Sequence, residues 1–123
     1  MKEFTDDRFS IRLVDGIVYV EWFYEYITYE FVDAGIKIRK EITEGKSYPM
    51  LSDIRKVKSG SREARQRLSD QDAGEGITAV AVLVKSKTHR ILYNFFTSIY
   101  KDPAPTRLFT DEAEAFKWLS QYK

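Results

Sequence analysis

The chain has 123 residues, with 20 Lys and Arg, 19 Asp and Glu, and no cysteine. This length suits one domain that buries a core without disulfide bonds, so we expect residues 1–123 to form a single domain in which residues 1–8 are candidates for disorder. The lack of cysteine excludes a disulfide scaffold and a thiolate metal site, and the net charge of +1 provides no overall field for nucleic acid or an anionic membrane.

The first predicted elements are a β-hairpin and a helix. Apolar and polar residues alternate over residues 9–13, Asp15-Gly16 is a pair typical of tight turns, and a second strand covers residues 17–23. A helix begins after Thr28, which can cap it, and ends at Gly45.

The N-terminus has no apolar run that would serve as a secretory signal and no segment suits a membrane span, so we expect a cytoplasmic location.

The second half of the chain alternates strands and helices. A strand is predicted over residues 48–57, followed by a helix that Ser61 caps. Residues 77–84 form an unbroken apolar run, which is typical of a central strand covered on both faces. Ser86 then caps a third helix.

The chain ends with a short strand and a last helix. Residues 106–109 are predicted to form an edge strand, and Thr110 is predicted to cap the final helix. The whole order indicates an α/β fold with a mixed, largely parallel sheet of about five strands, four helices and an N-terminal β-hairpin.

The chain resembles the STAS-like family of small bacterial proteins. The resemblance lies in the order of elements and in four segments, residues 48–55, 77–84, 94–96 and 108–115. These proteins are related in fold to the anti-sigma-factor antagonists and, more distantly, to the CRAL-TRIO lipid-binding domains. The resemblance implies a STAS-like fold over nearly the whole chain. It says little about function, because the most similar subgroup has no established activity.

The resemblance also implies a switch segment. In the antagonists, a strand that ends in Asp is followed by a loop and a Ser that a partner kinase phosphorylates. Asp53 matches the strand Asp, and Ser59 or Ser61 lies near the phosphorylated position, although the antagonists have Asp-Ser-Ser-Gly-Leu where residues 58–62 are Lys-Ser-Gly-Ser-Arg. A phosphate on Ser61 would meet free N–H groups at a helix start, but Ser61 can equally be a simple helix cap.

Cations gather after two of the predicted strands. If these strands are neighbours, the cations converge at the carboxyl edge of the sheet, where open α/β sheets bind ligands, and a phosphate or carboxylate group is the expected ligand. The alternative is an ordinary solvated surface. This candidate basic rim consists of Arg55, Lys56, Lys58, Lys85, Lys87 and Arg90.

Aromatic residues are concentrated where the second strand passes into the first helix. Either they cap the core, or some form an exposed patch that docks a protein partner or a second copy of the chain. This candidate interface consists of Trp22, Phe23, Tyr24, Tyr26 and Tyr29.

Signals for catalysis are weak. His89 is the single histidine, and no nucleophile-elbow motif, second metal ligand or Gly-rich phosphate loop accompanies it, so we expect no enzyme, no cofactor and no metal site. The basic run at residues 55–67 contains no aromatic residue and is followed by acidic ones, which argues against nucleic acid. The sequence therefore predicts a non-enzymatic regulatory interaction module, with a binder of a small anionic or lipid-like ligand as the alternative.

Overall fold

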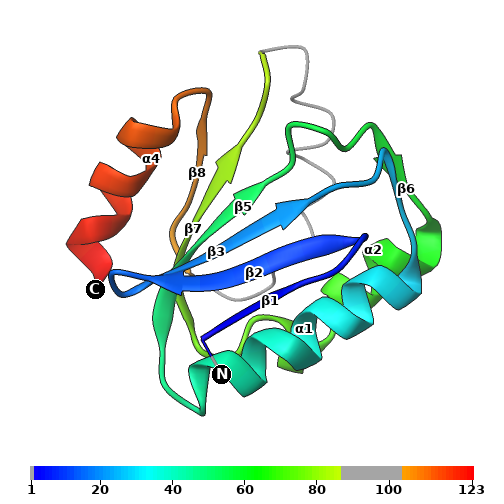
Figure 1. Ribbon diagram of the computed structural model, residues 1–123, viewed down its shortest axis with the longest axis horizontal. Helices are drawn as coiled ribbons and strands as arrows, with labels where there is room; N and C mark the ends of the chain where they lie inside the picture. Colours follow the sequence, from blue (N-terminus) through cyan, green and yellow to red (C-terminus); the bar gives the residue numbers. More distant parts are fainter. Residues whose placement is uncertain (1, 87–103) are drawn as a thin grey trace.

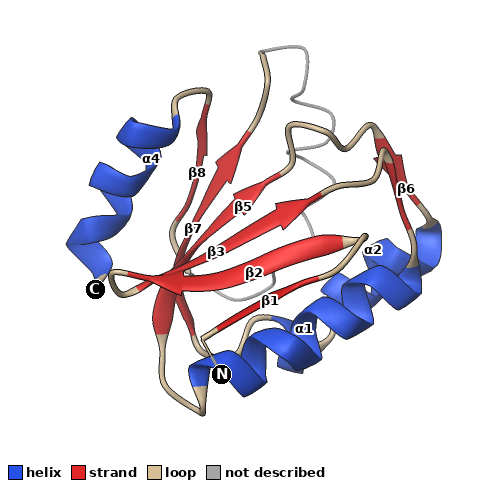
Figure 2. Ribbon diagram, viewed as in Figure 1, coloured by secondary structure: helices blue, strands red, loops and turns tan. Residues whose placement is uncertain are grey.

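The computed structural model describes residues 2–86 and 104–123. They form a six-stranded mixed sheet of order β1-β2-β3-β5-β7-β8, and Figures 1 and 2 show α4 on the opposite side of this sheet from α1 and α2. The sheet strands are β1 (Glu3–Thr5), β2 (Phe9–Val14), β3 (Ile17–Trp22), β5 (Tyr48–Asp53), β7 (Ile77–Leu83) and β8 (Thr106–Phe109). The helices are α1 (Tyr29–Thr43), α2 (Arg62–Leu68) and α4 (Glu112–Leu119), with 3-10 turns η1 (Gln71–Ala73) and η3 (Ser120–Tyr122). A second, two-stranded sheet joins β4 (Tyr26–Ile27) to β6 (Ser59–Gly60).

The predicted N-terminal hairpin is confirmed. Asp15 and Gly16 have φ angles of 52° and 77°, the left-handed conformations that a tight hairpin turn requires, and Val14 pairs with Ile17. The sheet has six strands rather than about five, because β1 pairs antiparallel with β2. No sequence signal predicted β1.

The helix α1 connects two parallel neighbours, β3 and β5. It starts after Thr28 as predicted, although the Thr28 side chain makes no capping hydrogen bond. It ends in two left-handed residues, Glu44 at φ 50° and Gly45 at φ 78°, so Gly45 terminates the helix as the sequence indicated. The helix carries the chain across one face of the sheet and thereby makes the parallel pairing possible.

Alternate residues of the inner strands β3, β5 and β7 build two separate cores. Val18, Val20 and Trp22 of β3 belong to the core under α1 and α2, whereas Ile17 and Tyr19 belong to the core under α4. The predicted central strand, β7, lies between β5 and β8 and is buried over Ala79–Leu83, so it is covered on both faces. The predicted edge strand is confirmed as β8.

Three predicted details need correction or fall outside the described residues. The strand predicted over residues 48–57 ends at Asp53, because the Asp53 carboxylate accepts a hydrogen bond from the Arg55 N–H and turns the chain. The cap of α4 is Asp111 rather than Thr110, since its Oδ1 accepts from the Ala113 N–H at 3.0 Å. The helix predicted after Ser86 lies outside the described residues, within which there are three α-helices.

No helix in residues 2–86 and 104–123 is long and apolar enough to cross a bilayer.

Candidate functional site

The aromatic residues of the candidate interface divide between core and surface. Trp22 is buried in the core and meets Phe9 edge to face, with ring centroids 5.4 Å apart. Phe23 is half-buried, and the Lys56 ammonium lies 5.2 Å from its ring centroid. The other three side chains are exposed and are called the tyrosine surface: Tyr24 at 44%, Tyr26 at 52% and Tyr29 at 43%.

The tyrosine surface lies where the chain leaves the main sheet. Tyr24 follows β3, Tyr26 is in β4, and Tyr29 is the first residue of α1. Tyr24 packs edge to face on Phe31 with centroids 5.0 Å apart, and its hydroxyl donates to Asp7 at 3.3 Å. Within the described residues the hydroxyls of Tyr26 and Tyr29 make no hydrogen bond, and both side chains are exposed, so they can bond to another molecule.

The switch segment lies directly beside the tyrosine surface. The strands β4 and β6 pair in parallel, with Tyr26 opposite Ser59 and Ile27 opposite Gly60. The Glu25 carbonyl accepts from the Ser59 N–H at 3.0 Å, and the Ile27 carbonyl accepts from the Ser61 N–H at 2.9 Å. Two candidate sites that are far apart in the sequence therefore form one surface, and Figure 1 shows β6 at the opposite end of the molecule from α4.

The two serines of this segment differ in what their hydroxyls do. Ser61 caps α2, since its Oγ accepts from the Ala64 N–H at 3.0 Å, so the capping alternative describes its role in the fold. Ser59 is exposed, and its hydroxyl makes no protein hydrogen bond in the part of the chain that the structure describes. Ser59 is thus the more accessible of the two.

Asp53 lies at the end of β5 but faces α4, away from the tyrosine surface. Its buried carboxylate accepts from the Tyr19 hydroxyl at 3.0 Å and from both Nε and Nη2 of Arg55, at 3.0 and 2.7 Å. Glu112, the first residue of α4, accepts from the same Tyr19 hydroxyl at 2.7 Å and lies 3.5 Å from Arg55 Nη2. Asp53 therefore belongs to a network that fastens α4 to the sheet.

This network keeps the Tyr19 hydroxyl protonated and the Arg55 guanidinium charged. Burial raises the pKa of Tyr19 above its usual value of 10.0, and the hydrogen bond to Glu112 and the charge of Asp53 raise it further. The hydrogen bond to Asp53 raises the pKa of Arg55. One hydroxyl proton is shared by two carboxylates, and the cation of Arg55 compensates the second negative charge.

The structure describes four of the six residues of the basic rim. The three cations that follow β5 each form an ion pair with a carboxylate. The Arg55 guanidinium lies 2.7 Å from the Asp53 carboxylate. The Lys56 and Lys58 ammonium groups lie 3.8 Å from Glu21 and 3.2 Å from Glu25, respectively. Lys85 is exposed just after β7, which neighbours β5 as the hypothesis requires, while Lys87 and Arg90 lie outside the described residues. These pairings reduce the positive charge that an anion would meet at this part of the edge.

The sequence analysis missed a second charge network, which surrounds the buried Arg67. Arg67 of α2 donates to Asp33 of α1 at 3.0 Å and to both carboxylate oxygens of Asp72 at 2.8 and 3.0 Å. The hydrogen bond from Arg67 lowers the pKa of Asp72, and that of Asp33 is lowered by Lys37 and Arg67. The network ties α2 and η1 to α1, so it serves the fold, and the sequence offered only a cation followed by two nearby Asp residues as a signal.

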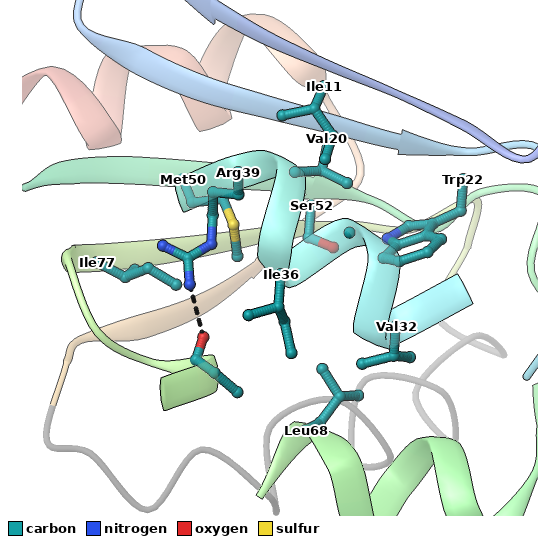
Figure 3. A pocket seen from close by; sticks show the side chains of 12 residues that line it. Ile11, Val20, Trp22, Val32, Ile36, Arg39, Met50, Ser52, Leu68 and Ile77 are labelled. Carbon is teal, nitrogen blue, oxygen red and sulfur yellow. Dashed lines mark hydrogen bonds between the residues drawn. The ribbon is translucent and has the colours of Figure 1, made fainter. Parts of the chain in front are cut away.

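A small cavity lies between α1 and the sheet (Figure 3). Its volume is about 30 Å³, enough for about one water molecule, and a lipid-like ligand would need far more. Trp22 Nε1, on its wall, is a buried polar atom without a hydrogen-bond partner, while the Arg39 guanidinium donates to the Ala73 carbonyl at 3.0 Å.

Among the described residues no group of three or more His, Cys, Asp or Glu suits a metal ion.

A family model described as a domain of unknown function, DUF7793, matches residues 9–123. The chain belongs to this family. No curated protein matches the sequence.

The DUF7793 chain is similar to a crystal structure of an uncharacterized protein from the DUF3478 family with a SpoIIAA-like fold, from Shewanella loihica PV-4. The TM-score is 0.67 at 17% identity, over 90% of this chain and 91% of that one. This match confirms the STAS-like fold that the sequence resemblance implied. A second structure, a protein with unknown function from Arthrobacter sp. FB24, is 25% identical over 89% of this chain and 97% of that one. Its TM-score of 0.36 is too low to indicate a shared fold.

Proposed function

We propose that this DUF7793 chain is a non-enzymatic protein-interaction module that docks its partner on the tyrosine surface, with Ser59 as the position that controls docking. One observation carries the proposal. Of the four large hydrophobic side chains that are exposed in the described residues, three are Tyr24, Tyr26 and Tyr29, and the small β4–β6 sheet joins them to Ser59.

The chemistry of the tyrosine surface favours a protein as the ligand. A tyrosine offers a large apolar ring and a polar tip at low cost in conformational entropy, which is why tyrosine is enriched in the centres of protein interfaces. The surface lies at the opposite end of the molecule from α4, so a docked protein would not disturb the Tyr19 network (Figure 1).

Ser59 is placed to change this surface without changing the fold. A phosphate would add a charge of about −1.5 to −2 directly opposite Tyr26 and next to Lys58 in the chain. Because the Ser59 hydroxyl bonds to no other described residue, its modification breaks no hydrogen bond of the structure. Modification of Ser61 would instead disturb the cap of α2.

A photo-crosslinking amino acid tests the docking proposal. We expect the crosslinker at Tyr26 to capture a defined protein in the cells that produce the chain, while the same crosslinker at Lys117, an exposed residue of α4, captures none. Equal capture at both positions would overturn the proposal.

The switch is tested in the same cells. We expect Ser59→Asp to change the crosslinking yield at Tyr26 several-fold and Ser59→Ala to leave it at the level of unmodified protein. If both substitutions leave the yield unchanged and mass spectrometry finds no phosphate on Ser59, the proposal that Ser59 controls docking is wrong. The proposal that a partner docks on the tyrosine surface is then unaffected.

A further inference from the structure

The surroundings of the tyrosine surface are divided by charge. Residues 21–31, which contain the three tyrosines, hold three Glu and no Lys or Arg, whereas residues 56–62 hold two Lys and one Arg and no acidic residue. We call Glu25 and Glu30 the acidic strip and Lys58 and Arg62 the basic strip. All four side chains are exposed.

The two strips meet at Glu25 and Lys58. The pairing of β4 with β6 brings the segments together, and the Lys58 ammonium lies 3.2 Å from the Glu25 carboxylate. These two side chains are 78% and 59% exposed, so water screens their attraction and the pair contributes little to stability. Either charge can therefore exchange its neighbour for a group on another molecule at small cost.

A patch with adjacent acidic and basic strips around exposed aromatic rings is complementary to itself. Rotation of one copy by 180° about an axis that lies in the patch and runs along the boundary between the strips brings its acidic strip opposite the basic strip of the other copy. The same rotation brings the cations of one copy near the tyrosine rings of the other, where cation–π contacts add to the attraction. The four charges of the strips sum to zero, so a partner surface of a single sign, such as nucleic acid or an anionic membrane, gains nothing from them.

We infer that the protein docked on the tyrosine surface is a second copy of this chain, in a two-fold dimer in which the acidic strip of each copy faces the basic strip of the other. The inference rests on the proposed function, because it names the partner for the same surface. It makes the chain a dimerising module.

A charge-exchange experiment tests the inference. One variant carries Glu25→Lys and Glu30→Lys, and the other carries Lys58→Glu and Arg62→Glu, so that each has a patch of one sign. By sedimentation equilibrium we expect the unmodified chain to dimerise and each variant alone to have a dimer Kd at least 10-fold higher, because like charges then face each other. A 1:1 mixture of the two variants is expected to form a heterodimer with a Kd close to that of the unmodified chain.

The control is a pair of charge reversals on α4. Glu114→Lys and Lys117→Glu change exposed side chains far from the tyrosine surface and are expected to leave the Kd unchanged. We expect chemical unfolding of every variant to show that the fold is retained, since all the replaced side chains are exposed.

The outcomes separate this inference from the proposed function. A chain that is monomeric at all concentrations, while Tyr26 still crosslinks a different protein, overturns the dimer and leaves docking intact. A dimer that neither the strips nor the tyrosines affect uses another surface, which overturns the inference, and it also argues against docking on the tyrosine surface. Variants that weaken the dimer separately but do not form a heterodimer contradict the two-fold arrangement of the strips.

Discussion

The tyrosines of this protein differ in burial: Tyr19 lies in a core, whereas the tyrosine surface is exposed. Tyr19 is 5% exposed, and its ring lies between the Arg12 guanidinium, 4.8 Å from the ring centroid, and Phe116, whose centroid is 5.7 Å away. Its hydroxyl donates to two carboxylates. Tyr26 and Tyr29 are exposed, and their hydroxyls make no hydrogen bond with the described residues. The contacts of Tyr19 therefore stabilise the fold, whereas the side chains of the tyrosine surface are available to a partner.

Position in the fold explains the difference. Tyr19 lies in the middle of β3, a strand with neighbours on both sides, and it points into the core under α4. The tyrosine surface begins after β3 has left the main sheet, where only the short β4–β6 pairing holds the chain. Four experiments test whether the Tyr19 network contributes to stability and the tyrosine surface to binding.

The largest effect is expected from Asp53→Ala. It removes a buried carboxylate that accepts from Tyr19 and Arg55, so we expect the free energy of unfolding to fall by about 3 kcal/mol. Urea unfolding measures the loss. The matched control is Asp7→Ala, which removes the exposed carboxylate that Tyr24 contacts, with an expected change within about 0.5 kcal/mol. Equal losses would remove the distinction between the two regions.

A smaller loss is expected from Tyr19→Phe. The substitution keeps the ring packed on Phe116 but removes the donor shared by Asp53 and Glu112, which should reduce stability by about 1 to 2 kcal/mol. Tyr24→Phe serves as the control, because its single long hydrogen bond is exposed. A neutral Tyr19→Phe would show that the network contributes no stability.

High pH should weaken the protein through Tyr19. Its pKa is raised in the folded state from a value of 10.0, so above pH 10 the unfolded chain loses a proton that the folded chain keeps. Stability is therefore present below pH 10 and falls above it, by at most about 1.4 kcal/mol per pH unit from this group. Urea unfolding between pH 9 and 11 should show a shallower fall for Tyr19→Phe than for Tyr26→Phe.

The smallest effect on stability is expected at the tyrosine surface itself. Tyr26→Ala and Tyr29→Ala replace exposed side chains, and each should change the free energy of unfolding by no more than about 0.5 kcal/mol. Sedimentation equilibrium should nevertheless show a dimer Kd raised at least 10-fold. A large loss of stability with unchanged association would reverse the roles assigned to the two regions.

Local sequence determined much of the fold. The Asp15-Gly16 turn, the end of α1 at Gly45, the Ser61 cap and the apolar strand β7 were all predicted, because each depends on residues that are neighbours in the chain. The Thr110 cap was wrong because Asp and Thr are both good caps and stand side by side, and only geometry selected Asp111.

The candidate site was predictable only in part. The concentration of aromatic residues was visible in the sequence, but which of them would be exposed was not: Trp22 points into the core and Tyr26 outward. The network around Asp53 was not visible either, since Tyr19 and Glu112 come from distant parts of the chain.

Local sequence patterns predict the types and order of most described elements and reveal the aromatic cluster. Long-range folding places Tyr26 opposite Ser59, brings Lys58 to Glu25, and brings Glu112 to Tyr19. The physical reason is that turns, caps and periodicity act over a few residues, whereas the pairing of parallel strands joins segments that the chain itself keeps far apart.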